Sequence, residues 1–345
     1  MTDIRQRKQD HIDLALQEAH QGQLGDQFDR LRFEPIAVPE LHLDQIDLSV
    51  EFLGRTCCAP IIIGAMTGGC DDGELINRHL AEAAEECQIP MAVGSQRAAL
   101  ELALPQRIRQ SAPNAVLLGN LGGTQLAQGG VDLAQAAVDS IDANALIIHL
   151  NPLQELAQPN GDRDWRGILR AIEACCQRLD VPLIVKEVGA GIGPTTAQRL
   201  IDVGVQWIEV AGRGGTNWGS IEMARNPSTR DAQIMQPFAD WGVHSIDLLP
   251  QLRALDGDLK LIGSGGVRHG LDVARCLRLG AKMAALAQPF LAPAMQSSRA
   301  VCEKIDILKE QLRRTMLLTG SADLAALACA AIDSSTPSQF SGQRT

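Results

Sequence analysis

The chain has 345 residues, 45% of them hydrophobic and 21% charged, so it can bury a large core and is not an intrinsically disordered protein. With 31 Lys and Arg against 41 Asp and Glu, its net charge of −10 argues against a surface for nucleic acid or anionic membranes. Only 3% of the residues are aromatic and none is Tyr, which argues against a platform for stacking bases.

Cysteine usage and the N-terminus indicate a cytoplasmic protein. The nine cysteines include two adjacent pairs but no C-x-x-C or zinc-type spacing, so we expect reduced thiols, most of them buried as small apolar side chains. The first ten residues are charged where a signal peptide needs an apolar run. No stretch approaches the roughly 18 uninterrupted apolar residues of a membrane span, and we expect no membrane contact.

The chain begins with a polar helix, expected over about 5–20, and an irregular stretch, so residues 1–58 are predicted to form an N-terminal extension. Eight short apolar runs then alternate with helical segments through 59–332, which is typical of a closed (β/α)8 TIM barrel; a doubly wound open sheet is the alternative. C-terminal helices are expected over about 295–318 and 322–332, and residues 333–345 have the composition of a disordered tail. The expected strands are 61–65, 91–93, 115–119, 145–150, 183–188, 207–210, 259–263 and 283–287, and the expected helices are 75–87, 133–141, 165–179, 196–203 and 271–279.

The residues that follow each predicted strand are rich in glycine and small polar side chains. In a barrel of this type, function gathers at the C-terminal ends of the strands, and glycine turns after strands seven and eight often bind phosphate through backbone N–H groups. One glycine pair is ordinary for a turn, but several at the same face favour a cofactor that carries a phosphate. These segments are Ala65-Met66-Thr67-Gly68-Gly69, Gly94-Ser95-Gln96-Arg97, Gly119-Asn120, Gly212 to Trp218, Gly263 to Arg268 and Leu286-Ala287-Gln288.

The fourth predicted strand ends in the most specific pattern. At a period of two, His149 and Asn151 face the same way, and Gln154 and Glu155 follow at the barrel mouth. One carboxylate beside neutral polar groups suits Mg²⁺, which takes one or two carboxylates and completes its shell with water and substrate phosphates. For either His149 or Glu155 alone, the alternative is a hydrogen-bonded histidine or a solvated loop carboxylate.

Lys186 lies inside the fifth predicted strand and should face the barrel interior, where an ammonium needs a partner. That partner is either a neighbouring carboxylate or an anionic cofactor ring. By itself the Arg7, Lys8 and His11 cluster has the pattern of a solvated helix face. The glycines between Gly189 and Gly193 lack the G-x-G-x-x-G spacing of a dinucleotide site.

Taken together, these segments resemble type II isopentenyl-diphosphate delta-isomerase, a flavin-dependent family of isoprenoid biosynthesis. The resemblance runs from about residue 7 to 288. One departure is at 241–245, where the family more usually has Pro-Thr and this chain has His244-Ser245, which keeps the hydroxyl group. The motifs are RKQDHI, AMTGG, VGSQRAAL, HLNPLQE followed by QPNGD, VKEVGAGI, VAGRGGTNW followed by SIEMAR, and GSGGVRHG.

This resemblance implies an enzyme that interconverts isopentenyl and dimethylallyl diphosphate, with FMN active in its reduced form, Mg²⁺ on the diphosphate, and NADPH as reductant. It also implies a homo-oligomer, a tetramer or octamer. The residues implied at the flavin are Ala65, Met66, Thr67, Gly68, Ser95, Asn120, Lys186, Thr216, Gly265, Gly266, Val267, Arg268, Ala287 and Gln288. Those implied at the substrate are Arg7, Lys8, His11, Ser95, Gln96, Arg97 and Gln154, with His149, Asn151, Gln154 and Lys186 as catalytic residues and Glu155 for Mg²⁺.

Two other functions have to be weighed. The first is an FMN-dependent oxidoreductase of the hydroxy-acid oxidase type, which would share the barrel and the flavin. Such enzymes need a basic histidine after strand six, where this chain has Arg213-Gly214-Gly215. The second is a non-catalytic scaffold that binds flavin or phosphate, and it predicts that no substrate is turned over.

Overall fold

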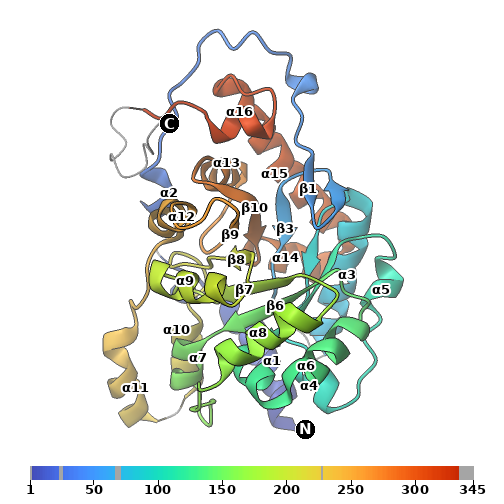
Figure 1. Cartoon of the computed structure of the whole chain (residues 1–345), viewed down its shortest axis with the longest axis vertical. Coiled ribbons are helices and arrows are strands. Elements are labelled where there is room, and N and C mark those ends of the chain that lie inside the picture. Colours follow the sequence, from blue (N-terminus) through green and yellow to red (C-terminus); the bar gives the residue numbers. More distant parts are fainter. Residues whose placement is uncertain (1, 23–25, 67–70, 227, 334–345) are drawn as a thin grey trace.

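The computed structural model describes residues 2–22, 26–66, 71–226 and 228–333. Eight parallel strands close into a barrel in the order β10-β3-β4-β5-β6-β7-β8-β9, with helices packed around it (Figure 1). The predicted TIM barrel is therefore confirmed, and the open sheet is excluded. The strands of the barrel are β3 (Ile61–Ile63), β4 (Met91–Ala92), β5 (Leu117–Gly122), β6 (Ala145–Leu150), β7 (Leu183–Glu187), β8 (Trp207–Glu209), β9 (Lys260–Gly263) and β10 (Ala281–Leu286).

The helices follow the predicted alternation, with two differences near the C-terminus. The helix expected over 295–318 begins three residues later, at Ser298, because the Ser297 hydroxyl accepts a hydrogen bond from the Ala300 N–H (3.1 Å) and caps a new helix there. Only the centre of the segment expected over 322–332 is helical. The helices from β3 onward are α3 (Asp71–Cys87), α4 (Arg97–Glu101), α5 (Ile108–Ser111), α6 (Gly123–Asp139), α7 (Pro152–Ala157), α8 (Ile168–Arg178), α9 (Pro194–Asp202), α10 (Trp218–Arg225), α11 (Thr229–Met235), η3 (Gln236–Phe238), α12 (Ser245–Arg253), α13 (Gly270–Arg278), α14 (Gln288–Gln296), α15 (Ser298–Leu318) and α16 (Leu324–Ala328).

The N-terminal extension packs along the barrel and shares its core. The expected first helix ends early, at Ala15, and a separate turn follows. Phe28 and Leu31 are fully buried in the same hydrophobic cluster as the barrel helices. Farther along, Phe33 pairs with Ile332 in an antiparallel bridge, so the extension lies beside the C-terminal segment near α16 (Figure 1). The extension contains α1 (Thr2–Ala15), η1 (Glu18–His20), α2 (Asp26–Asp29) and η2 (Leu43–Gln45).

A two-stranded hairpin that the sequence analysis did not predict ends the extension. Strands β1 (Val50–Phe52) and β2 (Arg55–Cys57) pair antiparallel. Phe52 and Cys57 belong to the cluster inside the barrel, and the Phe52 ring meets Trp207 edge to face at 5.0 Å between centroids. The hairpin therefore supplies side chains to the packed interior of the barrel.

Strand alternation separates the apolar interior from a polar layer above it. Ile147, Ile184 and Trp207 pack inside the barrel, whereas their neighbours in sequence face the helices. Two residues farther along the same strands, the interior positions become polar: His149, Lys186 and Glu209. Register pairs His149 with Lys186 and Lys186 with Glu209, so the three side chains form one layer at the C-terminal ends of the strands.

In the part of the chain that the structure describes, no helix has both the length and the apolar character needed to cross a membrane. The eight cysteines described are free thiols, and Cys70 lies outside the described residues. Residues 334–345, which contain nearly all of the expected disordered tail, also lie outside them.

Candidate functional site

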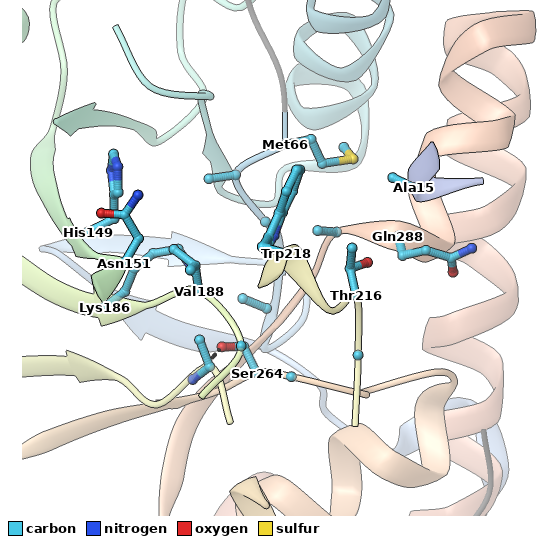
Figure 2. Close-up of a pocket in the computed structure, with 18 of the residues that line it drawn as sticks. Ala15, Met66, His149, Asn151, Lys186, Val188, Thr216, Trp218, Ser264 and Gln288 are labelled. Carbon is cyan, nitrogen blue, oxygen red and sulfur yellow. Dashed lines mark hydrogen bonds between the residues drawn. The ribbon is translucent and has the colours of Figure 1, made fainter. Parts of the chain in front are cut away.

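A cavity of about 500 Å³ opens at the C-terminal ends of the strands, a volume within the range of small-molecule and cofactor sites. Figure 2 shows His149, Asn151 and Lys186 on one side of it and Thr216 and Gln288 on the other, with Trp218 between them. Thr67 and Gly68 lie outside the described residues. Every other residue expected at the site lines this cavity, except Gln96.

Lys186 forms a buried ion pair at the floor of the cavity. Its Nζ lies 3.0 Å from Glu209 Oε1 and donates to the Glu187 carbonyl at 2.9 Å. The carboxylate partner predicted for Lys186 is therefore observed, and because Lys186 also lines the cavity, its contact with an anionic cofactor ring stays a prediction. A buried pair held by a further hydrogen bond places a fixed positive charge where an anionic ring could contact it.

His149 is held in one tautomer by its neighbour on β5. Asn120 donates its amide N–H to the Val93 carbonyl (3.0 Å), so its oxygen faces His149 Nδ1 at 2.8 Å, and Nδ1 must carry the proton. Nε2 is then a hydrogen-bond acceptor. Burial, reinforced by the charges of Lys186 and Lys8, lowers the pKa of His149 to about 3, and the imidazole is neutral at physiological pH.

We expect the His149 imidazole to remain neutral as the pH falls from 7.5 to 5. Because its folded pKa lies below the ordinary 6.5, its contribution to stability is present above pH 6.5 and is lost as the pH falls towards 3. Nitrogen NMR of labelled histidine will measure this, with the signal assigned by its loss in His149→Gln. An imidazole that gains its proton near pH 6.5 would contradict the expectation.

Helix α1 forms one wall of the cavity, so the interpretation of Arg7, Lys8 and His11 as a solvated face is wrong. All three line the cavity. His11 Nε2 lies 2.9 Å from a carboxylate oxygen of Glu222 on α10, and the His11 ring meets Trp218 at 5.2 Å between centroids. Burial lowers the pKa of His11, although the hydrogen bond to Glu222 opposes the shift. These contacts turn the face of α1 that carries the cluster inward.

Glu222 is a central residue that the sequence analysis missed, although it lies in the SIEMAR segment. It is 0% exposed and receives hydrogen bonds from Gln154 (3.2 Å) and Arg225 (2.7 Å) as well as the contact with His11. Burial alone would raise the pKa of Glu222, but the interactions with His11, Arg225 and Gln154 together outweigh it and the net shift is downward. Glu222 and His11 are 211 positions apart in the sequence, so no local sequence pattern predicts that they meet.

The Gln154 amide is held at both ends. Its Nε2 donates to Glu222, and its Oε1 accepts from Asn151 Nδ2 at 3.1 Å. Gln158 extends this network, because its amide, oriented to satisfy both neighbours, accepts from Arg7 at 3.0 Å and donates to Glu222 at 3.2 Å. The network fixes the orientation of a neutral amide beside the polar layer.

Glu155 lies where the cavity meets the cationic side chains of α1 and the loop after β4. It is buried, and its two oxygens accept from Asn151 Nδ2 (3.0 Å) and the Asp162 N–H (2.8 Å). Arg97 is nearby, paired with Glu101 and with Asp162. Among the described residues no three His, Cys, Asp or Glu side chains cluster for a metal. Glu155, with the ion-paired Asp162 and Glu101 nearby, fits Mg²⁺ that keeps water and takes phosphate oxygens, and does not fit a cage built by protein alone.

The opposite end of the cavity consists of closely stacked glycine loops. Gly265 (φ +89°) and Gly266 (φ +79°) have left-handed backbones, and a Cβ on Gly265 would lie 2.1 Å from the Gly212 carbonyl oxygen. Ser245 ties these loops together: its hydroxyl accepts from the Gly212 N–H at 2.9 Å and donates to the Ser264 carbonyl. The hydroxyl kept at 245 therefore has a structural role.

Arg268 lines the same end of the cavity but is fully engaged by carboxylates. Its guanidinium contacts Asp272 (2.7 Å) and Asp29 (3.0 Å), which together raise the pKa of an already basic group. Lys304 on α15, which the sequence analysis did not single out, also lines the cavity, and burial lowers its pKa. It forms no ion pair with the described part of the chain.

Gln96 does not line the cavity, and the expectation that it binds substrate stays a prediction. It is 1% exposed; its amide donates to the Ala137 carbonyl (3.0 Å) and the Ser140 hydroxyl (2.9 Å), and accepts from the Asn120 N–H (2.7 Å). Gln96 precedes α4, where the chain turns, so its side chain points back towards α6.

The glycine-rich loop after β7 serves a carboxylate of the chain itself. The backbone N–H groups of residues 188, 189 and 191 donate to Glu187 at 2.7, 2.7 and 3.2 Å, and that of Ala190 does so as well. This agrees with the rejection of a dinucleotide site at Gly189–Gly193. Burial raises the pKa of Glu187 despite these hydrogen bonds.

Comparisons with known proteins agree with this geometry. The family model described as FMN-dependent dehydrogenase matches residues 152–334. Among solved structures, a mandelate oxidase variant with a C4a-OH-FMN adduct has a TM-score of 0.67 at 18% identity, covering 96% of this chain and 98% of that one. At that identity the likeness concerns the fold alone.

Curated relatives are much more similar in sequence. An isopentenyl-diphosphate delta-isomerase from Stutzerimonas stutzeri is 49% identical over 327 residues, which are 93% of this chain and 94% of the relative. One from Nostoc sp. is 41% identical over 326 residues, covering 93% of each chain. Identity of this level over nearly the whole length, on a barrel whose cavity gathers the matching residues, establishes that the chain belongs to the isopentenyl-diphosphate delta-isomerase family.

Proposed function

We propose that this protein interconverts isopentenyl diphosphate and dimethylallyl diphosphate, using FMN in its reduced form and Mg²⁺. The observation that carries the proposal is the continuity of one cavity. Its cationic end (Arg7, Lys8 and Arg97) adjoins Glu155, and its floor is the His149, Lys186 and Glu209 layer. The curated relatives that are 49% and 41% identical to this chain bear the name of the same activity.

One end of the cavity suits the substrate diphosphate, and the other end suits the flavin phosphate. Arg7, Lys8 and Arg97 would bind the diphosphate, and Glu155 would hold the Mg²⁺ that neutralises part of its charge. The flavin phosphate would lie against the Gly265–Gly266 turn, with Lys186 near the flavin ring. NADPH is proposed as the source of the reducing equivalents.

Moving the double bond requires a proton added at one carbon and another removed two carbons away, through a tertiary carbocation that water would capture. When bound in its reduced form, FMN supplies an acid–base nitrogen and an electron-rich ring. Trp218 and Met66 line the cavity and would exclude water. The Gln154 amide, fixed by Glu222 and Asn151, would orient the reacting carbons or relay a proton.

The histidines named at this site are poorly suited to act as the base that a hydroxy-acid oxidase needs to remove a proton from carbon. With a pKa of about 3, His149 is a weak base, and His11 is engaged by Glu222. Arg213 stands where the basic histidine would be, and its guanidinium contacts Asp240 at 2.6 Å. These observations favour the isomerase.

Anaerobic turnover with the flavin in each oxidation state tests the proposal. We expect proton NMR to follow conversion of isopentenyl diphosphate only after the bound FMN has been reduced, and only with Mg²⁺ present. Equal rates with oxidised and reduced flavin would refute the acid–base role of the flavin. Flavin binding without turnover in either state would favour the non-catalytic scaffold.

A further inference from the structure

Helix α2 lies outside the barrel and contacts the turn after β9 on the side that faces away from the cavity. Phe28 and Leu31 anchor this short segment in the core. Between them and the barrel, Gln27 is 8% exposed, and its Nε2 donates to the Gly265 carbonyl at 2.9 Å. Asp29 from the same helix contacts Arg268 at 3.0 Å. Gly265 and Arg268 in the loop between β9 and α13 are thus both held by residues far away in sequence.

The Gln27 amide occupies a space that only glycines leave open. A Cβ on Gly214 would lie 1.9 Å from Gln27 Nε2, and a Cβ on Gly266 would lie 2.2 Å from the same atom. Both glycines have positive φ angles, +114° and +79°. The amide is therefore enclosed by the two loops that line the cavity after β8 and β9.

Stability alone does not explain a glutamine at this position. Gln27 Oε1 is buried and has no hydrogen-bond partner among the described residues. Leaving such an acceptor unsatisfied is unfavourable, whereas an apolar side chain of similar shape would fill the space without that cost. Among the described residues, the Gln27 side chain therefore makes its hydrogen bond through the Nε2 donor and not through the Oε1 acceptor.

The hydrogen bond from Gln27 fixes the direction of the peptide between Gly265 and Gly266. In a trans peptide the carbonyl of one residue and the N–H of the next point in opposite directions, so holding the Gly265 carbonyl from outside turns the Gly266 N–H the other way. Gly265, Gly266 and Val267 line the cavity on that other side. Backbone N–H groups directed into a cavity at glycine turns are a common means of binding phosphate.

We infer that Gln27 is a positioning residue for the cofactor phosphate: its amide fixes the Gly265–Gly266 peptide so that the Gly266 N–H faces a phosphate. This inference rests on the proposed placement of the FMN phosphate at this turn. It concerns binding of the phosphate alone, so it predicts discrimination between FMN and riboflavin, which carries the same ring without a phosphate.

The test is fluorescence titration of the flavin-free protein with FMN and with riboflavin. In Gln27→Met, which keeps the volume and removes the donor, we expect the Kd of FMN to rise about tenfold, roughly the loss of one hydrogen bond to a charged group, with riboflavin affinity unchanged. Gln27→Glu should weaken FMN further, because its carboxylate repels the phosphate. Gln251→Met, the same substitution on the exposed side of α12, serves as the matched control.

Parallel weakening of FMN and riboflavin would overturn the inference, because it would indicate a general packing role. Unchanged FMN affinity in both variants would overturn it as well. If Gln27→Met does not fold, Gln27→Leu, which also removes the donor and adds no charge, decides through the ratio of the two dissociation constants. No readout depends on turnover, so a failure of the proposed isomerase reaction would be seen separately, as an inactive wild-type protein with normal FMN binding.

Discussion

Glu155→Gln will lose Mg²⁺-dependent turnover by about a thousandfold or more while keeping its bound flavin. The neutral amide keeps the shape and can still accept from the Asp162 N–H, but it lacks the charge that a hard cation requires. Several kcal/mol of charge stabilisation would be lost, which corresponds to this fall in rate. Turnover against Mg²⁺ concentration and the visible flavin spectrum will measure the two properties.

The matched control is Glu173→Gln, the same substitution at an exposed position of α8. It should leave both turnover and flavin content unchanged. Retained Mg²⁺-dependent activity in Glu155→Gln would remove this residue from the metal site. A colourless protein would instead place Glu155 in support of the flavin.

Lys186→Met should lower both stability and activity, and a second substitution should separate the two effects. Removing the lysine leaves the Glu209 carboxylate buried without its partner, which typically costs about 3–5 kcal/mol of unfolding free energy. It also removes the positive charge next to the proposed flavin ring. We therefore expect a lower melting temperature, a more negative flavin reduction potential, and turnover reduced by about a hundredfold or more.

The double variant Lys186→Met with Glu209→Gln no longer has an unpaired buried charge, so the melting temperature should recover in part. Its activity and flavin potential should stay low, because the positive charge is still absent. Thermal unfolding, turnover and potentiometry on the single and double variants give the comparison. If activity returned together with stability, Lys186 would have only a structural role.

The barrel was predictable because its signal is local. Each strand of a buried parallel sheet is a short apolar run, and the position of Lys186 inside such a run predicted that it faces the interior. Strand alternation predicted that His149 and Asn151 face the same way, and in the structure Asn151 follows the last residue of β6. The β1–β2 hairpin escaped prediction because its strands have three residues each and alternate with charged or polar positions such as Glu51 and Arg55.

The contacts that complete the site could not be predicted, because they join residues far apart in sequence. Glu222 meets His11 across 211 positions, and Gln27 meets Gly265 across 238. The orientation of Gln96 could not be predicted for the opposite reason: it neighbours Ser95 and Arg97 in sequence, but the turn into α4 directs its side chain away from the cavity. Residues that are neighbours in sequence after a strand end can point their side chains in different directions, because the chain no longer has the regular alternation of a strand.

The N-terminal extension serves both ends of the barrel. Through α1 it walls the mouth, and through Phe52 of the β1–β2 hairpin it reaches the packed interior beneath the polar layer. A truncated chain that began at the first barrel strand would lose both the α1 wall of the cavity and the hairpin side chains that pack inside the barrel. The extension is thus inseparable from the catalytic body, and the minimal working unit is longer than the eight-stranded repeat itself.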